Sequence, residues 1–479
     1  MEDKSLKKLI CACKKIYNKD APLKIEWIVA ILIGIIMLLM FSYIDLKSLT
    51  IWSTNIFDCI AEGDISQYYS YTALNKYNVS HKYVSGTLYS LMIWAIWNIP
   101  IWLIQYFKGI EIINNEFLLV WSKLFLVASL GTTLFLTYKI CNILFKEKKM
   151  SKWITFLATT FIYTYIGVLY AGQNDILICM FATLGLYFLI REKNIWFYIF
   201  SALAISVKYF YLIPYIPLIL LTEKKIWKII VKIGSGISPI ILFRILFSSF
   251  PMYFESQAAN KSDSILKGFF GSGIKVANGV TLSFFVLAFI IICFIAYITK
   301  PKSKEIKNNY VFYFASAPII VMLMFSTHYE FYRPILLMPI LMILYGFKPK
   351  LFRINIILDT IMGATSFGAM LIKSEYILNT KYSMANFVLS NRTGVIKEVC
   401  ISNYLKNLLG DNIGIAESFI TTIMFAAFAI ILVINYPKCD ILKENTEEKV
   451  EKPERWIIWM RQLVVVPMIA LLLFNVIRG

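Results

Sequence analysis

A short polar stretch, Gly172-Gln173-Asn174-Asp175, interrupts a long apolar run and could carry chemistry. The stretch lies within YIGVLYAGQNDILICMFATLGLYFL, and the longer apolar run around it has room for two membrane spans, so Asp175 lies where lipid would otherwise be. A carboxylate at membrane depth is costly, and it usually faces a protein interior or a watery cavity on a functional path. The glycine and the amides also suggest a helix break, which lipid tolerates only where the backbone lines a cavity. A plain turn between two spans is the alternative, and this stretch alone favours neither.

Lys208 is the second charge in an apolar setting, 33 residues after Asp175 within AISVKYFYLIPY. An uncompensated cation in lipid is so unfavourable that a functional role is favoured over a plain interfacial position. Asp175 is the obvious internal partner. We therefore expect Lys208 to rest on Asp175 in the empty site and to shift to an anionic group of the ligand when that binds.

Other polar residues fall on the side of the membrane that the charge pattern, described below, places outside. They are Asp58, Glu62, Asp64, His81, Lys82, His328, Glu330 and Arg333. For Glu62, Lys82 and Glu330 an ordinary interfacial charge is the favoured interpretation. Carboxylates that face cations at an outer membrane surface suit chemistry on a lipid phosphate. A carboxylate can act as general base on a hydroxyl, and Lys or Arg can hold a departing phosphate.

The composition points to a helical membrane protein. The chain has 479 residues, 59% hydrophobic and 16% charged, with a mean hydropathy of +0.68. Successive apolar runs long enough to cross a bilayer predict an all-α polytopic bundle. The net charge of +19 does not indicate nucleic acid, because the lysines recur in short clusters between spans, as in cytoplasmic loops. The eight cysteines form no CxxC pair, and no Cys/His cluster indicates zinc. No cofactor is predicted, and a divalent metal is left open.

The basic clusters set the expected topology. With them inside, residues 46–83 form an external loop, and about 13 crossings follow, with the N-terminus inside and the C-terminus outside. Two full spans between that loop and residue 145 would turn every later cluster outward. We therefore expect residues 84–116 to be a re-entrant hairpin broken at Pro100. The expected crossings begin near Trp27 and continue at 117–140, 152–170, 176–190, 195–207, 209–221, 229–247, 276–299, 309–327, 331–346, 354–372, 416–436 and 456–476.

The chain divides into five predicted regions. They are a cytoplasmic basic leader (1–24), a catalytic membrane module (25–221), a variable membrane region (222–437) with external loops 248–275 and 373–415, a cytoplasmic linker (438–455) and a final membrane helix (456–479).

The order of these motifs resembles the GT-C class of membrane glycosyltransferases. The resemblance rests on an external loop with Asp leading into a Tyr-rich helix, then HKYVSGTLYSLMIWAI, VWSKLFL, and GQND with a Lys downstream. It covers roughly residues 25 to 220, and within the class it is closest to the polyprenyl-phosphate-mannose-dependent mannosyltransferases. The resemblance implies transfer of a sugar from a lipid-linked donor on the non-cytoplasmic face, with inversion at the anomeric carbon. The family's usual Tyr-Pro-Pro is YVSGTLY here, where Gly86 could supply the bend.

The resemblance also implies roles for single residues. Asp64 matches the first-loop catalytic carboxylate, with Asp58 as its competitor, and Tyr68 and Tyr69 follow in the Tyr-containing helix. The substrate-binding residues that the resemblance and the outer-side charges suggest are Gln173, Asn174, Asp175, Lys208, Lys123, His81, Tyr68, Tyr69, His328 and Arg333.

The function expected from the sequence is thus an inverting hexosyltransferase of the cell membrane. It would move mannose or another hexose from a polyprenyl phosphate to a lipid or cell-surface glycan acceptor, with an Asp general base. A flippase or polymerase of lipid-linked polysaccharides, or a solute transporter, are the alternatives. A flippase should carry charges in both membrane halves, and a transporter should show repeat symmetry, which the sequence does not display.

Overall fold

A computed structural model gives the structure of the chain, and it is all-α apart from one short hairpin within the described residues. The described residues are 21–40, 44–74, 84, 88–109, 116–259, 268–276, 280–325, 332–373, 401–437, 453–467 and 469–470. Most of the leader, the linker and the external loop 373–415, together with His81, Lys82, His328 and Glu330, lie outside these ranges.

Within those ranges, six helices are long and apolar enough to cross a membrane, or seven if a bent pair counts as one span. The bent pair joins α7 to η3 at an angle of 57°. Five further apolar helices are shorter than a full span. These features are typical of a multi-pass membrane protein. The figure of about 13 crossings stays a prediction.

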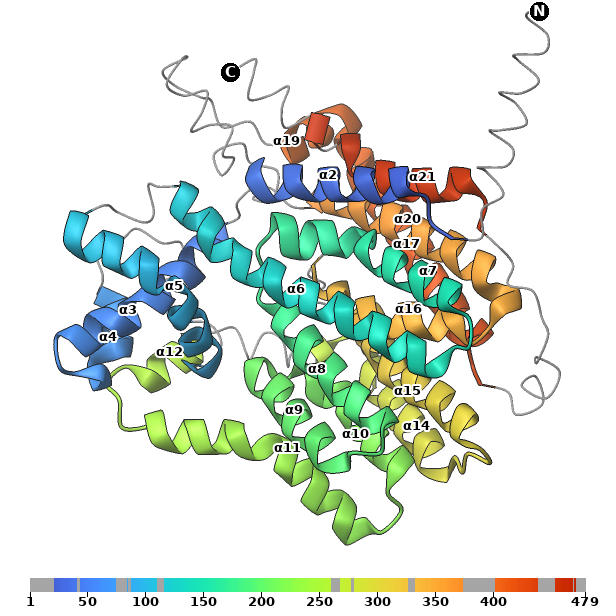
Figure 1. Ribbon diagram of the computed structural model, residues 1–479, viewed down its shortest axis with the longest axis horizontal. Coiled ribbons are helices and arrows are strands. Elements are labelled where there is room, and N and C mark those ends of the chain that lie inside the picture. Colours follow the sequence, from blue (N-terminus) through green and yellow to red (C-terminus); the bar gives the residue numbers. More distant parts are fainter. Residues whose placement is uncertain are drawn as a thin grey trace, which may run out of the picture.

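The elements follow one another along the chain (Figure 1). Their bounds are α2 Lys24–Met40, α3 Ile44–Ala61, η1 Ile65–Gln67, α4 Tyr68–Leu74, α5 Leu88–Lys108, α6 Glu116–Leu144, α7 Lys148–Thr159, η3 Thr164–Tyr170, α8 Asp175–Ile190, α9 Asn194–Val207, η4 Tyr209–Tyr211, α10 Leu212–Thr222, α11 Ile226–Phe247, α12 Tyr253–Ala259, β1 Gly273–Lys275, β2 Thr281–Ser283, α14 Phe284–Ile298, α15 Lys304–Phe325, η6 Arg333–Leu337, α16 Met338–Gly346, η7 Pro349–Leu351, α17 Phe352–Lys373, α19 Ile401–Leu409, η9 Gly410–Asn412, α20 Ile413–Ile434 and α21 Arg455–Leu463.

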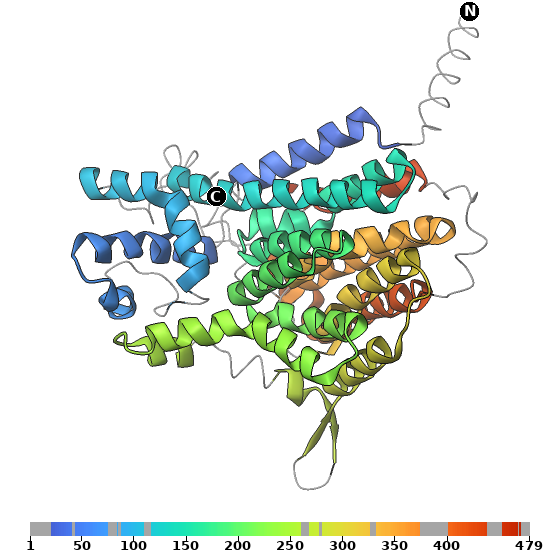
Figure 2. The same ribbon diagram turned by 60° about the horizontal axis from the view of Figure 1, so that its bottom comes forward.

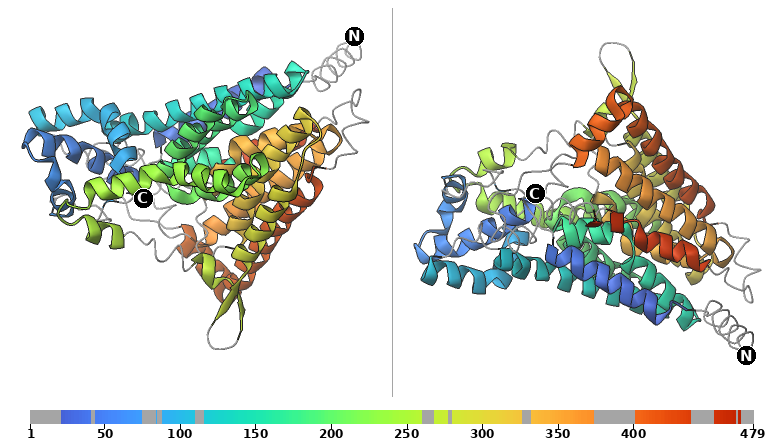
Figure 3. Two further views of the ribbon diagram at one scale, coloured as in Figure 1. Left: turned by 90° about the horizontal axis from the view of Figure 1, so that it is seen from below. Right: turned by 90° about the horizontal axis from the view of Figure 1, so that it is seen from above.

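The helices form two groups. Helices α3, α4, α5 and α12 lie together at one end, and α14–α17 and α20 lie at the other, with α8–α10 between them (Figures 1 and 3). Helix α6 runs from the first group across the bundle to the side where α7 begins, and α11 extends along the underside (Figures 1 and 2). The strands β1 and β2 pair antiparallel and project from the bundle next to α14. The polar stretch at residues 172–175 leads into α8, which begins at Asp175.

The expected break at Pro100 is absent, and that expectation was wrong. Residues 88–108 form the single helix α5, with Pro100 inside it. A proline removes one backbone donor, and membrane helices tolerate this when neighbouring groups compensate. Helix α5 is well supported here, because Asn98 donates to the hydroxyls of Ser53 in α3 and Ser122 in α6 at 2.9 and 3.1 Å. These polar contacts join α5 to both α3 and α6.

The segment expected as an external loop contains the buried helix α3. Its residues Ser48, Thr50 and Ser53 are all fully buried. The hydroxyl of Thr50 donates to Ser122 in α6 at 2.8 Å, and the indole of Trp94 in α5 donates to the same oxygen at 2.9 Å. A polar side chain can be buried without a large penalty only when it is hydrogen-bonded. The network therefore fixes α3 in position against α5 and α6.

Lysine side chains cap the C-terminal ends of two helices, α14 and α20. Lys224 donates to the carbonyls of Ala296 and Tyr297 at the end of α14, at 3.1 and 2.5 Å. Lys348 donates to the carbonyls of Ile434 and Tyr436 at the end of α20, at 2.6 and 2.8 Å. The last carbonyls of a helix lack partners in the helix, and a cation there also suits the helix dipole. Lysines from two of the basic clusters thus stabilise the ends of helices.

A buried ion pair joins the two ends of the described chain. Arg455 in α21 donates from one guanidinium nitrogen to both carboxylate oxygens of Glu26 in α2, at 2.8 and 3.0 Å. Their side chains are 3% and 0% exposed. Glu26→Ala would remove the carboxylate that balances the buried guanidinium charge, so we expect a loss of about 3–5 kcal/mol in the free energy of unfolding. Unfolding in mixed micelles, followed by tryptophan fluorescence, measures this loss.

The exposed pair between Lys304 and Glu192, also at 2.9 Å, provides the control. Lys304→Ala should cost less than about 1 kcal/mol, because surface pairs contribute little. Equal costs for the two variants would show that Glu26 and Arg455 are hydrated in the protein.

Candidate functional site

Asp175 and Lys208 form an ion pair between the start of α8 and the residue that follows α9. The ammonium nitrogen of Lys208 lies 2.7 Å from Oδ1 of Asp175, and the side chains are 23% and 1% exposed. Asp175 is the first residue of α8, where a carboxylate suits the helix dipole. Lys208 interrupts the helical path between α9 and η4 with an extended backbone, φ −149° and ψ 135°. Asp175 thus begins a helix, and Lys208 lies between two helices. The ion pair that the sequence predicts between them is present.

The turn that precedes Asp175 follows from Gly172. The π-helix η3 ends at Tyr170, and the Gln173 N–H donates to the carbonyl of Gly167 at 3.0 Å, which closes the turn. Gly172 has φ +61°, a conformation that glycine adopts without the penalty of other residues. A Cβ at Gly172 would lie 3.1 Å from Cβ of Leu46 in α3. The turn is therefore packed against the start of α3.

Asp45 joins the site through this contact. The amide nitrogen of Gln173 donates to Oδ2 of Asp45 at 2.6 Å, across 128 residues of sequence. Asp45 lies in the first turn of α3 and is partly buried. The sequence reasoning missed Asp45, although one signal was available: it is the first carboxylate after the first apolar run. The site thus contains two carboxylates. Asp45 is hydrogen-bonded to Gln173, and Asp175 follows Gln173 by two residues in the sequence.

Asn174 directly precedes Asp175, and Arg333 contacts the short helix that follows Lys208. Asn174 is buried and caps α8, where its carbonyl accepts from the N–H of Leu177 at 3.0 Å. Arg333 begins η6, and its guanidinium lies 5.0 Å from the ring centre of Phe210, two residues after Lys208. A guanidinium over an aromatic ring is a favourable cation–π contact. Arg333 is thus held against η4, the short helix that follows Lys208.

Lys123 has a different environment from the one expected. It is fully buried in α6, and its ammonium lies 3.4 and 3.3 Å from the carbonyls of Met37 and Leu38 in the last turn of α2. These contacts hold the end of α2, after which the chain leads to Asp45. Lys123 therefore stabilises the end of α2, and no ligand is needed to explain its burial.

Asp64 is not brought to the turn at 172–175. Helix α3 has 18 residues, so at about 1.5 Å per residue it is about 27 Å long, with Asp45 at its start and Asp64 beyond its end. The carboxylate of Asp64 accepts from the Ser66 N–H at 3.0 Å and caps η1. These hydrogen bonds with Ser66 lower the pKa of the exposed Asp64 carboxyl. Its role in the structure is to cap the start of η1.

Asp58 lies one turn before the end of α3, among aromatic rings. Its Oδ1 accepts from the indole N–H of Trp102 at 2.8 Å, and its Oδ2 is 3.5 Å from the hydroxyl of Tyr71. Burial raises the pKa of the Asp58 carboxyl, and the Trp102 and Tyr71 contacts oppose this in part. Asp58 is therefore held by the first helix group and, like Asp64, is not brought to the turn.

Tyr68 and Tyr69 are buried packing residues. The Tyr68 hydroxyl donates to the carbonyl of Trp52 at 2.9 Å, and the Tyr69 ring meets the Tyr253 ring edge-on, with centres 5.2 Å apart. Through Tyr253 the expected external loops 46–83 and 248–275 contact each other. Both tyrosines hold α4 in place, and this explains their burial.

Replacing Asp58 by Asn tests its environment. A carboxyl whose pKa is raised binds its proton more tightly in the folded protein than in the unfolded chain. At neutral pH the group is ionised, and it then lowers the free energy of unfolding. This destabilisation disappears as the pH falls through the raised pKa. Asn keeps the acceptor for Trp102 and carries no charge. We expect the melting temperature of Asp58→Asn at pH 7 to equal that of wild type or exceed it by about 1–2 °C. Its melting temperature should also vary less than that of wild type between pH 4 and 7. A large loss at pH 7 would contradict this account.

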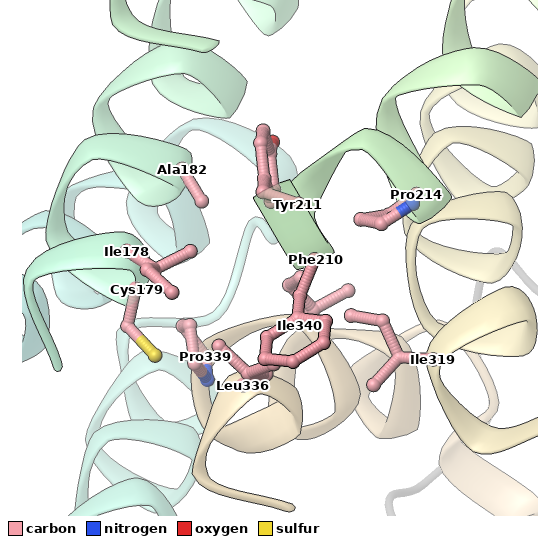
Figure 4. A pocket seen from close by; sticks show the side chains of 10 residues that line it. All are labelled: Ile178, Cys179, Ala182, Phe210, Tyr211, Pro214, Ile319, Leu336, Pro339 and Ile340. Atoms are coloured by element: carbon pink, nitrogen blue, oxygen red, sulfur yellow. The ribbon is translucent and has the colours of Figure 1, made fainter. Parts of the chain in front are cut away.

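A small cavity lies one helical turn beyond Asp175. Its volume is about 10 Å³, room for about one water. Figure 4 shows its lining, which comes from α8, η4, α10, α15, η6 and α16. The lining residues are Ile178, Cys179, Ala182, Phe210, Tyr211, Pro214, Ile319, Leu336, Pro339 and Ile340. This wall is almost wholly apolar, so it keeps the local dielectric constant low and strengthens the attraction between Asp175 and Lys208.

Within the described ranges, no group of three or more His, Cys, Asp or Glu residues gathers to hold a metal ion. Comparison with protein-family models, with curated proteins and with solved structures finds no match to this chain. Its function is therefore inferred from the geometry around Asp45, Gln173, Asp175 and Lys208.

Proposed function

We propose that the protein is an inverting glycosyltransferase of the cell membrane that takes a hexose from a polyprenyl phosphate and passes it to a hydroxyl of a glycan or lipid acceptor. The observation that carries the proposal is the buried Asp175–Lys208 pair, linked by the turn at 172–175 to a second carboxylate, Asp45. Sugar transfer from a phosphate needs a carboxylate as general base and a cation to hold the phosphate, and Asp45 and Lys208 provide these two groups. The bilayer supplies the lipid donor.

The cations bind the donor phosphate in this proposal. Lys208 is 23% exposed, so its ammonium can reach a ligand while it stays beside Asp175. Its partner Asp175 begins α8, and the N-terminus of a helix favours anions. Arg333 adds a second positive charge near Phe210. A phosphate at Lys208 would place the anomeric carbon towards the turn at 172–175.

Asp45 is the general base. As the acceptor oxygen forms its bond to the anomeric carbon, the bond from that carbon to the phosphate oxygen breaks, and the acceptor proton passes to Asp45. The lipid phosphate leaves with the bonding electron pair, and its growing charge is neutralised by Lys208. Gln173 orients Asp45 through the 2.6 Å hydrogen bond. The acceptor attacks opposite the phosphate, so the configuration inverts.

The positive-inside bias supports a site on the non-cytoplasmic face. Helix α8 leads from Asp175 to the turn at residues 191–193, and α9 leads from this turn back to Lys208. The turn consists of Arg191, Glu192 and Lys193. Helix α8 has 16 residues, so it separates these ends by about 24 Å. If the 191–193 turn is cytoplasmic, as its basic residues favour, the site opens on the other side.

Purified protein in proteoliposomes tests this function. The probes are farnesyl phosphate esters of tritiated mannose and glucose, offered with a lipid extract as the acceptor source, and the readout is the sugar label that leaves the phosphate. Protein-dependent loss of one sugar from its phosphate, with formation of free farnesyl phosphate, is the expected result. Movement of the intact labelled lipid between leaflets without cleavage would favour the flippase alternative. If neither probe is cleaved, moved or bound, the proposal is wrong.

A further inference from the structure

Asp175 has an oxygen that no described residue satisfies. Its side chain is 1% exposed, and Lys208 approaches Oδ1. Oδ2 accepts no hydrogen bond from any residue that the structure describes. A buried carboxylate oxygen is costly to leave unpaired, so a group in such a position usually receives a donor from water or from a ligand.

No side-chain donor of the described residues around Asp175 donates to Oδ2. The Gln173 amide nitrogen is bonded to Asp45, and the Cys179 thiol points to the carbonyl of Ile335 at 3.4 Å. The apolar cavity wall one turn further along α8 offers little besides Cys179 and the Tyr211 hydroxyl. The donor for Oδ2 must therefore come from outside the described residues.

We propose that Oδ2 of Asp175 accepts a hydrogen bond from the hydroxyl on carbon 2 of the transferred sugar, and that Asp175 is a specificity-determining residue. This inference rests on the proposed function, because it requires the sugar's phosphate on Lys208. The ammonium lies 2.7 Å from Oδ1, so a phosphate on the same ammonium lies next to the carboxylate. In a sugar 1-phosphate the hydroxyl on carbon 2 is the one next to the anomeric carbon. It is therefore the hydroxyl best placed to reach Oδ2.

This hydrogen bond would let the site distinguish mannose from glucose. Mannose and glucose differ only in configuration at carbon 2, so the direction from which Oδ2 accepts selects one of them. Hydrogen bonds to this hydroxyl also strengthen in the transition state of glycoside cleavage as charge develops at the anomeric centre. The residue should thus affect the rate of transfer more than the affinity for the donor.

The test compares three lipid ligands with the wild-type protein in detergent. They are farnesyl phosphate, its preferred hexose ester (mannose or glucose), and the 2-deoxy ester that these two epimers share. We expect the 2-deoxy ester to bind about 10-fold more weakly than the hexose ester, because a hydrogen bond to a charged group is lost. Its transfer rate should fall further, by about 100-fold.

Asp175→Asn provides the second arm. With this variant the ratio between the hexose and 2-deoxy esters should fall to within about 3-fold, and the preference between mannose and glucose should be lost. Glu192→Gln, just beyond the other end of α8, is the matched control and should keep the wild-type ratios. The arm that uses only the wild type remains decisive even if Asp175→Asn does not fold.

The outcomes separate this inference from the proposed function. If wild-type protein binds farnesyl phosphate and its hexose esters but treats the 2-deoxy ester as equal, the inference alone is wrong. If the 2-deoxy penalty is present and persists unchanged in a folded Asp175→Asn variant, another residue reads the hydroxyl and the assignment is overturned. If no farnesyl phosphate ligand binds, the proposed function fails and this inference fails with it.

Discussion

Asp45→Asn is expected to lower the rate of sugar transfer by about two to four orders of magnitude, the usual contribution of a general base. The substitution keeps the shape of the side chain, and the Asn oxygen can still accept from the Gln173 amide, which donates to Asp45 at 2.6 Å. Donor affinity should therefore change by less than about 3-fold. Single-turnover transfer rates and donor binding, measured on the same preparation, separate the two effects.

Asp64→Asn is the matched control for Asp45→Asn. Asp64 lies beyond the other end of α3, exposed, with its hydrogen bonds confined to a local turn. Its replacement should leave the transfer rate within about 2-fold of wild type. A large loss in Asp64→Asn together with full activity in Asp45→Asn would return the base to the position that the family resemblance implies.

Lys208→Ala is expected to affect stability, donor binding and rate together. Removing the ammonium leaves the carboxylate of Asp175, 1% exposed, without its partner, which should cost about 3–5 kcal/mol of unfolding free energy. The departing phosphate also loses a charge-assisted contact, so transfer should slow by about 100- to 1,000-fold. Lys208→Arg should recover part of the rate, because charge is kept while the planar guanidinium does not reproduce a compact ammonium.

A double variant separates the structural effect from the catalytic one. Lys208→Met combined with Asp175→Asn removes both charges, so most of the lost stability should return while activity stays low. Melting temperature, donor affinity and rate are measured for each variant. Near-wild-type rates in Lys208→Ala would mean that the lysine only extends to the membrane interface.

The sequence was sufficient to predict the all-α class and the break before α8. Both follow from local properties: the apolar runs, and a glycine with amides and a carboxylate in the middle of one. The partnership of Asp175 and Lys208 was also predictable, since a charge in an apolar setting needs a counter-charge and few were available.

Contacts distant in sequence were not predictable in the same way. The sequence places Asp45, Asp58 and Asp64 in one segment, and only the direction of α3 decides which of them meets the turn at 172–175. That direction depends on buried hydroxyl contacts such as Thr50 with Ser122. Such pairings span dozens of residues and leave no periodic signal. The continuity of α5 through Pro100 was missed because proline in membrane helices is tolerated through neighbours that the sequence does not identify.

The account depends most on the start of α3 lying against the turn at 172–175, and disulfide trapping tests this directly. A Cβ at Gly172 would lie 3.1 Å from Cβ of Leu46, close to the spacing of about 3.5–4.5 Å found in disulfides. The double variant Leu46→Cys with Gly172→Cys is oxidised in native membranes. The chain is then cut at a protease site inserted at residues 145–152.

The single-cysteine variants report the background from the eight native cysteines. The matched pair is Gly63→Cys with Gly172→Cys, since Gly63 adjoins Asp64 and also has positive φ, at +82°. The account predicts that the two fragments stay joined until reduced in the Leu46 pair and separate in the Gly63 pair. Efficient joining in the Gly63 pair, with none in the Leu46 pair, would place Asp64 at the turn and contradict the site described here.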